Sequence, residues 1–307
     1  MIVVFGSINV DIEMHLERLP RPGETVLGAG YGVSAGGKGG NQALAAALAG
    51  SHVRMFGCVG RDEFAEPALG AMRKGGVDLA GVRVTDKPTG LATVWVDAVG
   101  ENSIAVASGA NREARADMVP PAALGRDTLL VLQMETPDRE VWQLIDKAKQ
   151  RGARVVLNLA PAVMAPPATL AKIDYLVVNE GEAKILAHEL DLEVDNPRAI
   201  PRRIVDRFGT TTIMTMGGAG MICVHKDGGW LQPALPISPV DTTGAGDAVT
   251  GAFAAAIDQR QDLLGALKWA AVAGGIACTR KGAQEAIANR KEIEAALPNL
   301  PPESIFG

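Results

Sequence analysis

The sequence predicts an α/β protein in which helices flank a doubly wound, mostly parallel β-sheet, with a small inserted β-sheet as a lid. From about residue 128 onward, short apolar runs alternate with helix-like stretches, which is typical of parallel strands joined by right-handed helical crossovers. Nearer the N-terminus, strand-like stretches alternate apolar with polar residues, as strands do when one face of their sheet is open to solvent. The two patterns therefore indicate two sheets of different burial.

The length of 307 residues allows two ordinary domains or one large domain with an appendage. We expect a discontinuous division, because the alternating strands interrupt the buried ones. Residues 1–8, 34–89 and 108–307 are predicted to form the α/β domain, and residues 9–33 and 90–107 are predicted to form the lid.

The elements near the N-terminus are of both kinds. Residues 2–5 are a continuous apolar run, which predicts a strand buried on both faces. Residues 10–16 and 24–33 predict half-exposed strands of the lid. Residues 91–99 and 103–107 predict two more lid strands, joined by a hairpin turn.

The elements of the second part follow the strand–helix rhythm, with apolar runs as strands and longer amphipathic stretches as helices. In order, they are predicted as strand 128–133, helix 138–150, strand 154–157, strand 175–178, helix 181–190, helix 197–208 and strand 211–215.

The composition excludes several classes of protein. Thirty Lys and Arg against 35 Asp and Glu give a net charge of −5, which offers no general attraction to nucleic acid or anionic lipid. The three cysteines form no C-x-x-C pair, so neither a disulfide framework nor a structural zinc site is indicated. No basic leader follows Met1, and no apolar run reaches the ~18 residues of a transmembrane helix. We therefore expect a cytoplasmic protein that binds neither nucleic acid nor membranes.

The 36 glycines cluster in a few turns, and the most informative cluster lies in residues 240–247, Val-Asp-Thr-Thr-Gly-Ala-Gly-Asp. Apolar residues at helical spacing follow, so residues 244–247 are predicted to open a helix. Free N–H groups and the positive end of the helix dipole make such a turn a cradle for a phosphate or an oxyanion. Asp247 is then placed to accept a proton from a hydroxyl that attacks a phosphoryl group. The alternative is an ordinary helix cap, but the motif is longer than a cap requires.

A second glycine cluster, residues 32–39, fits the first seven places of a Walker A loop. Gly39 stands in the eighth place without the hydroxyl that binds Mg²⁺, and the preceding stretch alternates like a lid strand. We interpret the run that leads into a helix at residues 43–49 as bare backbone beside a small polar ligand. Lys38 and Asn41 would supply its hydrogen bonds, and a flexible surface turn is the alternative.

Polar residues also follow other predicted strands, at the edge where open α/β sheets bind ligands. Because side chains alternate along a strand, Asn9 and Asp11 lie on the same face, where they could bind two neighbouring hydroxyl groups of a ligand. The alternative is that they are exposed residues of a lid strand. Residues 179–182 form an ordinary helix cap or hold Mg²⁺ through water. Residues 215–220 form a glycine-rich turn that could face a nucleotide, and Glu135 falls on the same edge.

These motifs, in this order and over essentially the whole chain, resemble the ribokinases of the PfkB carbohydrate kinase family. The D-T-x-G-A-G-D match is specific to that family, and the G-G-K-G-x-N signature strengthens it. The matching segments are residues 6–11, 22–25, 37–42, 89–90, 100–102, 109–111, 133–135, 158–162, 179 with 182, 241–247 and 279–284.

The resemblance implies a ribokinase-like fold and ATP-dependent phosphorylation of the primary 5-hydroxyl of D-ribose, with Mg²⁺ as cofactor. It implies that Asp247 is the base and that the turn of Gly244, Ala245 and Gly246 is the anion hole. The residues implied to hold the sugar are Asn9, Asp11, Gly37, Lys38, Asn41, Glu135 and Asp247. Those implied to bind ATP are Asn179, Thr215, Gly217, Gly220 and Gly246, with Glu182 organising Mg²⁺ through water.

The resemblance also implies a homodimer formed through the lid and activation by a monovalent cation, K⁺. The cation's ligands by position are Asp241, Thr243 and the backbone carbonyls of Ala277, Arg280 and Gly282. Ala286 stands where a side-chain hydroxyl is expected, so either water replaces that ligand or the K⁺ dependence is weak. Ala271 stands where relatives often carry a larger polar residue beside the adenine, which leaves the choice of base open.

Other functions fit parts of the same pattern. A nucleoside kinase or another sugar kinase of the same family would grip a ribose ring with the same residues. A sugar-binding protein without catalysis is a more distant alternative, which the presence of Asp247, Gly244, Gly246 and Lys38 disfavours. A P-loop NTPase is disfavoured by Gly39 and by the lack of a convincing Walker B strand.

Overall fold

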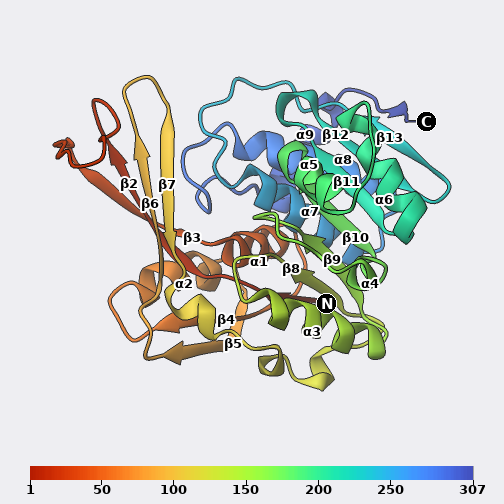
Figure 1. Cartoon of the computed structure of the whole chain (residues 1–307), viewed down its shortest axis with the longest axis horizontal. Helices are drawn as coiled ribbons and strands as arrows, with labels where there is room; N and C mark the ends of the chain where they lie inside the picture. The colour runs from red at the N-terminus through yellow and green to blue at the C-terminus, as the bar shows by residue number, and fades with distance from the viewer. Residues whose placement is uncertain (307) are drawn as a thin grey trace.

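Two sheets organise the chain, which the computed structural model describes over residues 1–306 (Figure 1). From β5 to β11, neighbouring strands of the 10-stranded sheet run parallel, and β12, β13 and β14 extend it antiparallel. Its order is β14 (Ser304–Ile305), β13 (Gly228–Gln232), β12 (Met221–His225), β11 (Thr211–Thr215), β10 (Tyr175–Asn179), β9 (Arg154–Asn158), β8 (Leu129–Leu132), β1 (Ile2–Phe5), β4 (Val53–Gly60) and β5 (Asp78–Thr85).

Helices cover both faces of this sheet. On one face lie α1 (Lys38–Leu48), α2 (Ala65–Lys74), α7 (Ala245–Asp258), α8 (Leu263–Ala277) and α9 (Arg290–Ala296). On the other lie α3 (Asp138–Gln150), α4 (Pro167–Leu170), α5 (Glu180–Glu189) and α6 (Ile200–Phe208). The predicted α/β class with a mostly parallel, helix-flanked sheet is confirmed.

The strand β1 shows why an unbroken apolar run is needed at the centre of such a sheet. Ile2 and Val4 lie in the hydrophobic core on one face, and Val3 and Phe5 lie in the core on the other. All four side chains are fully buried, each contributing ~1.5–3 kcal/mol relative to an exposed side chain. The strand therefore separates the two cores.

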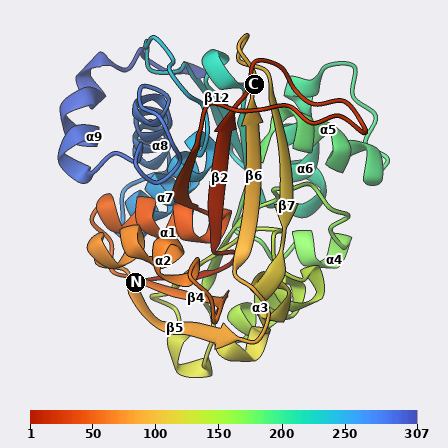
Figure 2. The same cartoon turned by 90° about the vertical axis from the view of Figure 1, so that its left-hand side faces the viewer.

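The small sheet is four-stranded and mixed, with the order β3 (Tyr31–Gly36), β2 (Asn9–His15), β6 (Gly90–Val96) and β7 (Asn102–Ala107). The inner strands β2 and β6 pair in parallel, and the outer strands pair with them antiparallel. It projects from the body of the molecule, and Figure 2 shows its strands side by side.

One lid strand differs from its prediction. Residues 24–33 were expected to form it, but β3 begins only at Tyr31 and continues to Gly36. Its pairing with β2 starts at Tyr31 opposite Met14, so residues 24–30 have no partner strand there. Apolar alternation alone does not make a strand without a neighbour to accept its hydrogen bonds.

Several elements lie in stretches for which the sequence pattern predicted none: β4, α2, β5, β12, β13, β14 and α9. Most other bounds agree closely, and α3 spans residues 138–150 as predicted. The helix predicted at residues 43–49 instead begins at Lys38, so Lys38 and Asn41 lie in its first turn and not in a run of backbone before it. Within residues 1–306, no helix combines the length and the apolar character that a bilayer crossing demands.

Candidate active site

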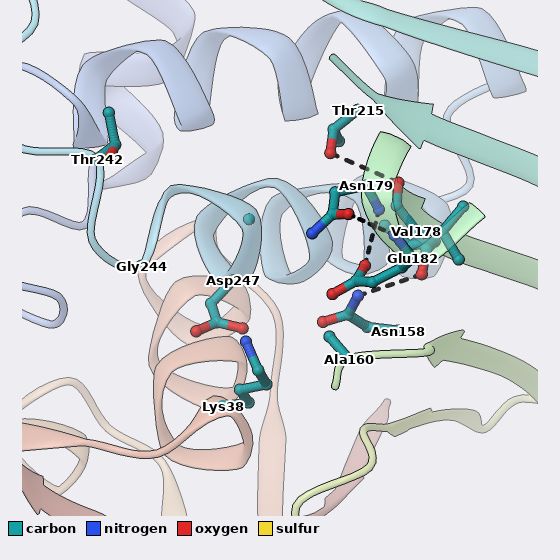
Figure 3. A pocket seen from close by; sticks show the side chains of 12 residues that line it. Lys38, Asn158, Ala160, Val178, Asn179, Glu182, Thr215, Thr242, Gly244 and Asp247 are labelled. Atoms are coloured by element: carbon teal, nitrogen blue, oxygen red, sulfur yellow. Dashed lines mark hydrogen bonds between the residues drawn. The ribbon is translucent and has the colours of Figure 1, made fainter. Parts of the chain in front are cut away.

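The polar residues predicted to act together gather at the carboxyl ends of the parallel strands, the edge where open α/β sheets bind ligands. Several of them line a cavity of about 230 Å³ between α7, α1 and the ends of β9, β10 and β11 (Figure 3). The cavity is lined by Lys38, Asn158, Ala160, Val177, Val178, Asn179, Glu182, Thr215, Thr242, Gly244, Gly246 and Asp247.

The N-terminus of α7 forms one wall of the cavity. Gly244 precedes the helix with φ of 72°, a left-handed conformation that glycine adopts without strain. The Ala245 N–H donates to the carbonyl of Thr242, but the N–H groups of Gly246 and Asp247 have no acceptor among the described residues. A Cβ at Gly246 would meet nothing within 4 Å, so the space beside this backbone is open. This turn can hold an anion.

The N-terminus of α1 shows the contrast, because the protein itself satisfies its N–H groups. The Lys38 N–H donates to Oε2 of Glu135 at 3.1 Å, and the Gly39 N–H donates to Oγ of Ser7 at 3.2 Å. The Ser7 hydroxyl donates to the same Glu135 oxygen at 2.6 Å. Of the two helix ends, that of α7 is therefore the open one.

Asp247 lies in the first turn of α7 and is 5% exposed. Its carboxylate accepts hydrogen bonds on both oxygens, from Nδ2 of Asn41 at 2.9 Å and from Nε2 of Gln42 at 2.8 Å. Figure 3 shows the Lys38 amine pointing toward this carboxylate across the cavity. The charge of Asp247, partly offset by burial, raises the pKa of Lys38, which keeps its amine cationic. A carboxylate and a cationic amine thus line the same cavity as the open turn at the start of α7.

Predicted sugar-binding residues lie near this pair, with Asn9 and Asp11 on β2 of the small sheet. Asn9 is buried, and its Oδ1 accepts a hydrogen bond from Nδ2 of Asn111 at 2.7 Å. Burial, together with the charges of Glu135 and Asp247, raises the pKa of Asp11 to about 7. Gly37 has φ of 84°, and a Cβ there would lie 2.7 Å from the backbone nitrogen of Asn9. Only glycine fits at this junction.

On the opposite side of the cavity, Asn179 and Glu182 form a reciprocal helix cap. The Glu182 N–H donates to Oδ1 of Asn179, and the Asn179 N–H donates to Oε2 of Glu182, each at 2.8 Å. The predicted capping interpretation is therefore correct, and both side chains also line the cavity. Burial raises the pKa of Glu182. Its remaining oxygen, with room for waters beside it, is a donor of the kind that Mg²⁺ prefers.

Thr215 ends β11 and lines the cavity, whereas Gly217 and Gly220 lie in the following turn and do not. A Cβ at Gly220 would approach the carbonyl oxygen of Gln232 to 2.1 Å, so the close passage of β13 already explains this glycine.

The residues predicted to hold a monovalent cation come together behind the anion-binding turn. The Asp241 carboxylate accepts the N–H groups of Thr243 and Gly282, each at 2.9 Å. Burial raises the pKa of Asp241, but these hydrogen bonds outweigh it and hold the pKa below its ordinary value. The Ala277 carbonyl accepts the Arg280 N–H at 3.4 Å. The methyl group of Ala286 is fully buried against Ala277 and Ala248, so it offers no ligand.

Sequence reasoning missed a set of buried amides that support the site. They contact Asp247, Asn9 or Asn41 directly or through one another: Gln42, Asn111, Gln133, Asn158 and Gln284. Each stands next to or inside a motif quoted above, but an amide carries no periodicity or charge to mark it.

Comparisons with known proteins place these features in a family. Residues 1–290 match the family model described as pfkB family carbohydrate kinase. A ribokinase of Haemophilus influenzae is 34% identical over 297 residues, covering 95% of this chain and 96% of that protein. A deoxyribokinase of Salmonella typhi is 35% identical over 300 residues, covering 96% and 98%. The structure of an Arabidopsis thaliana ribokinase complexed with ribose and ATP gives a TM-score of 0.86 at 30% identity, covering 96% of this chain and 98% of that one.

Proposed function

The chain belongs to the pfkB family of carbohydrate kinases, and we propose that it transfers the γ-phosphoryl group of ATP to the 5-hydroxyl of D-ribose, giving D-ribose 5-phosphate and ADP. The observation that supports this most directly is the open N-terminus of α7 with buried Asp247 in its first turn. The similarity to ribokinases, one of them complexed with ribose and ATP, supports ribose as the acceptor.

The reaction needs positioning and charge stabilisation more than covalent chemistry from the protein. Asp247 accepts the proton of the sugar hydroxyl as the new oxygen–phosphorus bond forms. The bond from the γ-phosphorus to its bridging oxygen breaks, and ADP leaves with the electron pair. The N–H groups of Gly246 and Asp247 and the Lys38 amine stabilise the charge on the transferred group.

The sugar is held between α1 and the lid. In this proposal Asn9, Asp11 and Gly37 bind the ribose hydroxyls, and Glu135 does so with the oxygen that does not cap α1. Asn41 donates one Nδ2 hydrogen to Asp247, which leaves its other Nδ2 hydrogen for the sugar.

The nucleotide lies on the other side, along Asn179 and the turn that begins at Thr215. Glu182 fits Mg²⁺ through water, and the ion when bound would neutralise phosphate charge. The carbonyl groups near Asp241 fit a monovalent cation, but the ligand set is incomplete at Ala286. We therefore propose that K⁺ binds weakly and activates only modestly.

We further propose that residues 9–33 and 90–107 close over the sugar as a lid and also form a homodimer. In the register of β2, Met14 lies opposite Tyr31 and Trp95, so these residues share one face of the small sheet. Val33 lies on the same face, and it and Tyr31 are 46% and 70% exposed. Asn9 and Asp11 alternate onto the other face, toward the site. An apolar face turned away from the site suits a second copy of the chain.

The dimer is tested by light scattering on the Tyr31→Glu variant. A dimeric wild type that becomes monomeric on this change supports the proposal. The matched control is Val106→Glu, at an exposed apolar position on the opposite face of the same sheet, which should remain dimeric. A monomeric wild type would refute it.

The activity is tested by ADP release with ATP and a panel of D-ribose, 2-deoxy-D-ribose, inosine and fructose 6-phosphate. We expect the highest kcat/KM with D-ribose. A preference for inosine would make the protein a nucleoside kinase, and a preference for 2-deoxy-D-ribose would place it beside the deoxyribokinase relative. No ADP release with any sugar would favour a sugar-binding protein without catalysis.

The three cysteines are free, which supports our proposal of a cytoplasmic location.

A further inference from the structure

Gln42 is fully buried, and its side chain amide is joined to three other polar side chains. Its Nε2 donates to Oδ1 of Asp247 at 2.8 Å and to Oδ1 of Asn158 at 3.0 Å. Its Oε1 accepts a hydrogen bond from Nε2 of Gln133 at 2.8 Å. Both hydrogens and the oxygen of this amide are thus engaged.

These contacts fix the direction of the amide. If it were turned over, its oxygen would face the oxygens of Asp247 and Asn158, and its NH₂ would face the Nε2 group of Gln133. Two acceptor–acceptor contacts and one donor–donor contact would replace three hydrogen bonds in a buried site. Gln42 therefore presents N–H, and only N–H, to the carboxylate.

Asn41 provides the same constraint for the second carboxylate oxygen. Its Nδ2 donates to Oδ2 of Asp247, and its Oδ1 accepts from Nε2 of Gln284 at 3.1 Å. Consecutive residues of α1 thus hold the two oxygens of one carboxylate on α7, and each is itself held by a further glutamine.

The close packing of α1 on α7 makes this possible. Gly251 lies one turn after Asp247, and a Cβ there would lie 2.5 Å from the Cβ of Ala45 and 2.6 Å from the carbonyl oxygen of Gln42. A larger residue at 251 would separate the helices and lengthen the hydrogen bonds to the carboxylate.

We infer that Gln42, oriented by Gln133 and Asn158, is a positioning residue that holds the Asp247 carboxylate aimed at the acceptor hydroxyl. The inference rests on the proposed function, since it gives Asp247 the role of base. Neutral amide donors suit this role because they stabilise the carboxylate without adding to the positive charge of Lys38, and they leave lone pairs for the substrate's proton.

The test is a double-mutant cycle on steady-state kinetics with the Gln42→Met and Asp247→Asn variants. Methionine keeps the volume and removes the donors, so Gln42→Met should lower kcat about 10- to 100-fold. KM for sugar and ATP should stay within about threefold, because the buried side chain touches neither. In the Asp247→Asn background the same change should cost less than about threefold, since Gln42 acts through the carboxylate.

The matched control is Gln232→Met. Gln232 is also fully buried, but its Nε2 donates to the carbonyls of Pro233 and Pro301, so its side chain takes no part in the hydrogen bonds around Asp247. It should lose stability but keep its kcat. If Gln42→Met does not fold, as judged by circular dichroism, Gln133→Met replaces it, with an expected fall in kcat of about 3- to 10-fold.

The results separate the two proposals. An Asp247→Asn protein with full activity would remove the proposed base, whatever Gln42 does. An inactive Asp247→Asn protein beside a Gln42→Met or Gln133→Met protein of wild-type kcat would overturn the positioning role alone. Additive losses in the cycle would also overturn it.

Discussion

Asp11 offers a prediction that couples the stability of the protein to its function. Burial and the neighbouring charges of Glu135, Asp247 and Glu285 raise its pKa from 3.8 to about 7. The folded state therefore binds this proton more tightly than the unfolded state does. The ionised Asp11 carboxylate destabilises the folded protein. This loss of stability is close to zero below about pH 4, grows as the pH rises toward 7, and is constant above that.

The magnitude follows from the two pKa values. Above pH 7 the ionised Asp11 costs at most about 4 kcal/mol, and at pH 5 it costs about 1.5 kcal/mol. The Asp11→Asn variant removes the charge and keeps the shape. It should therefore gain stability relative to the wild type, and the gain should be larger at pH 8 than at pH 5 by about 2.5 kcal/mol.

Urea unfolding of both proteins at pH 5 and pH 8 measures this difference. The sugar kinetics should move in the opposite direction, because an ionised Asp11 accepts hydrogen bonds from ribose hydroxyls. We expect the KM for ribose in the wild type to fall as the pH rises through 7, and to change little in Asp11→Asn. A stability difference that is the same at both pH values would refute the reasoning.

Three further predictions concern the anion-binding turn and the cation loop. Asp247→Asn should lower kcat about 10²- to 10⁴-fold with little change in KM, and near-normal turnover in a folded protein would exclude Asp247 as the base. Gly246→Val places a branched side chain over the open N–H groups and should raise the KM for ATP at least about tenfold while leaving the melting temperature nearly unchanged; an unaltered KM in initial-rate assays would show that phosphate does not approach this turn. Ala286→Ser buries a hydroxyl at a fully buried position, so it should lose about 1–3 kcal/mol in Na⁺ or tetramethylammonium buffer and recover part of that in K⁺, with a larger K⁺ activation than the wild type. Thermal melts and rates in the two salts check this, and equal losses in both salts would contradict a cation site there.

The fold was predictable where local pattern and burial coincide, and unpredictable where the tertiary structure decides. The strand at residues 2–5 is buried on both faces and is apolar throughout, and the helix at 138–150 is amphipathic. The local sequence pattern alone therefore predicts each element. The end of the sheet from β12 to β14 is not predicted in this way, because each of these strands takes its direction from antiparallel pairing with the strand before it in the sheet. The strand predicted at residues 24–33 is the opposite case, because an alternating pattern is present there but residues 24–30 have no partner strand.

The site divides in the same way. Asp247 and the glycines before it are contiguous in sequence, and their chemistry can be read from the motif. The amides that support Asp247 join residues 91 to 243 positions apart, such as Gln133 with Gln42 and Gln284 with Asn41. No spacing rule relates such residues, so only the three-dimensional structure could assign them.

Glycine shows most clearly what the sequence leaves undecided. Gly39, Gly246 and Gly251 look alike in the sequence, yet each is bare for a different reason. A Cβ at Gly39 would lie 2.6 Å from the backbone nitrogen of Ser7, and one at Gly251 would push α1 from α7, whereas one at Gly246 would meet only empty space. A side chain at the first two positions would disturb packing in the free protein. At Gly246 it would disturb nothing until a phosphate arrives, so loss of activity without loss of stability identifies a glycine that serves the ligand.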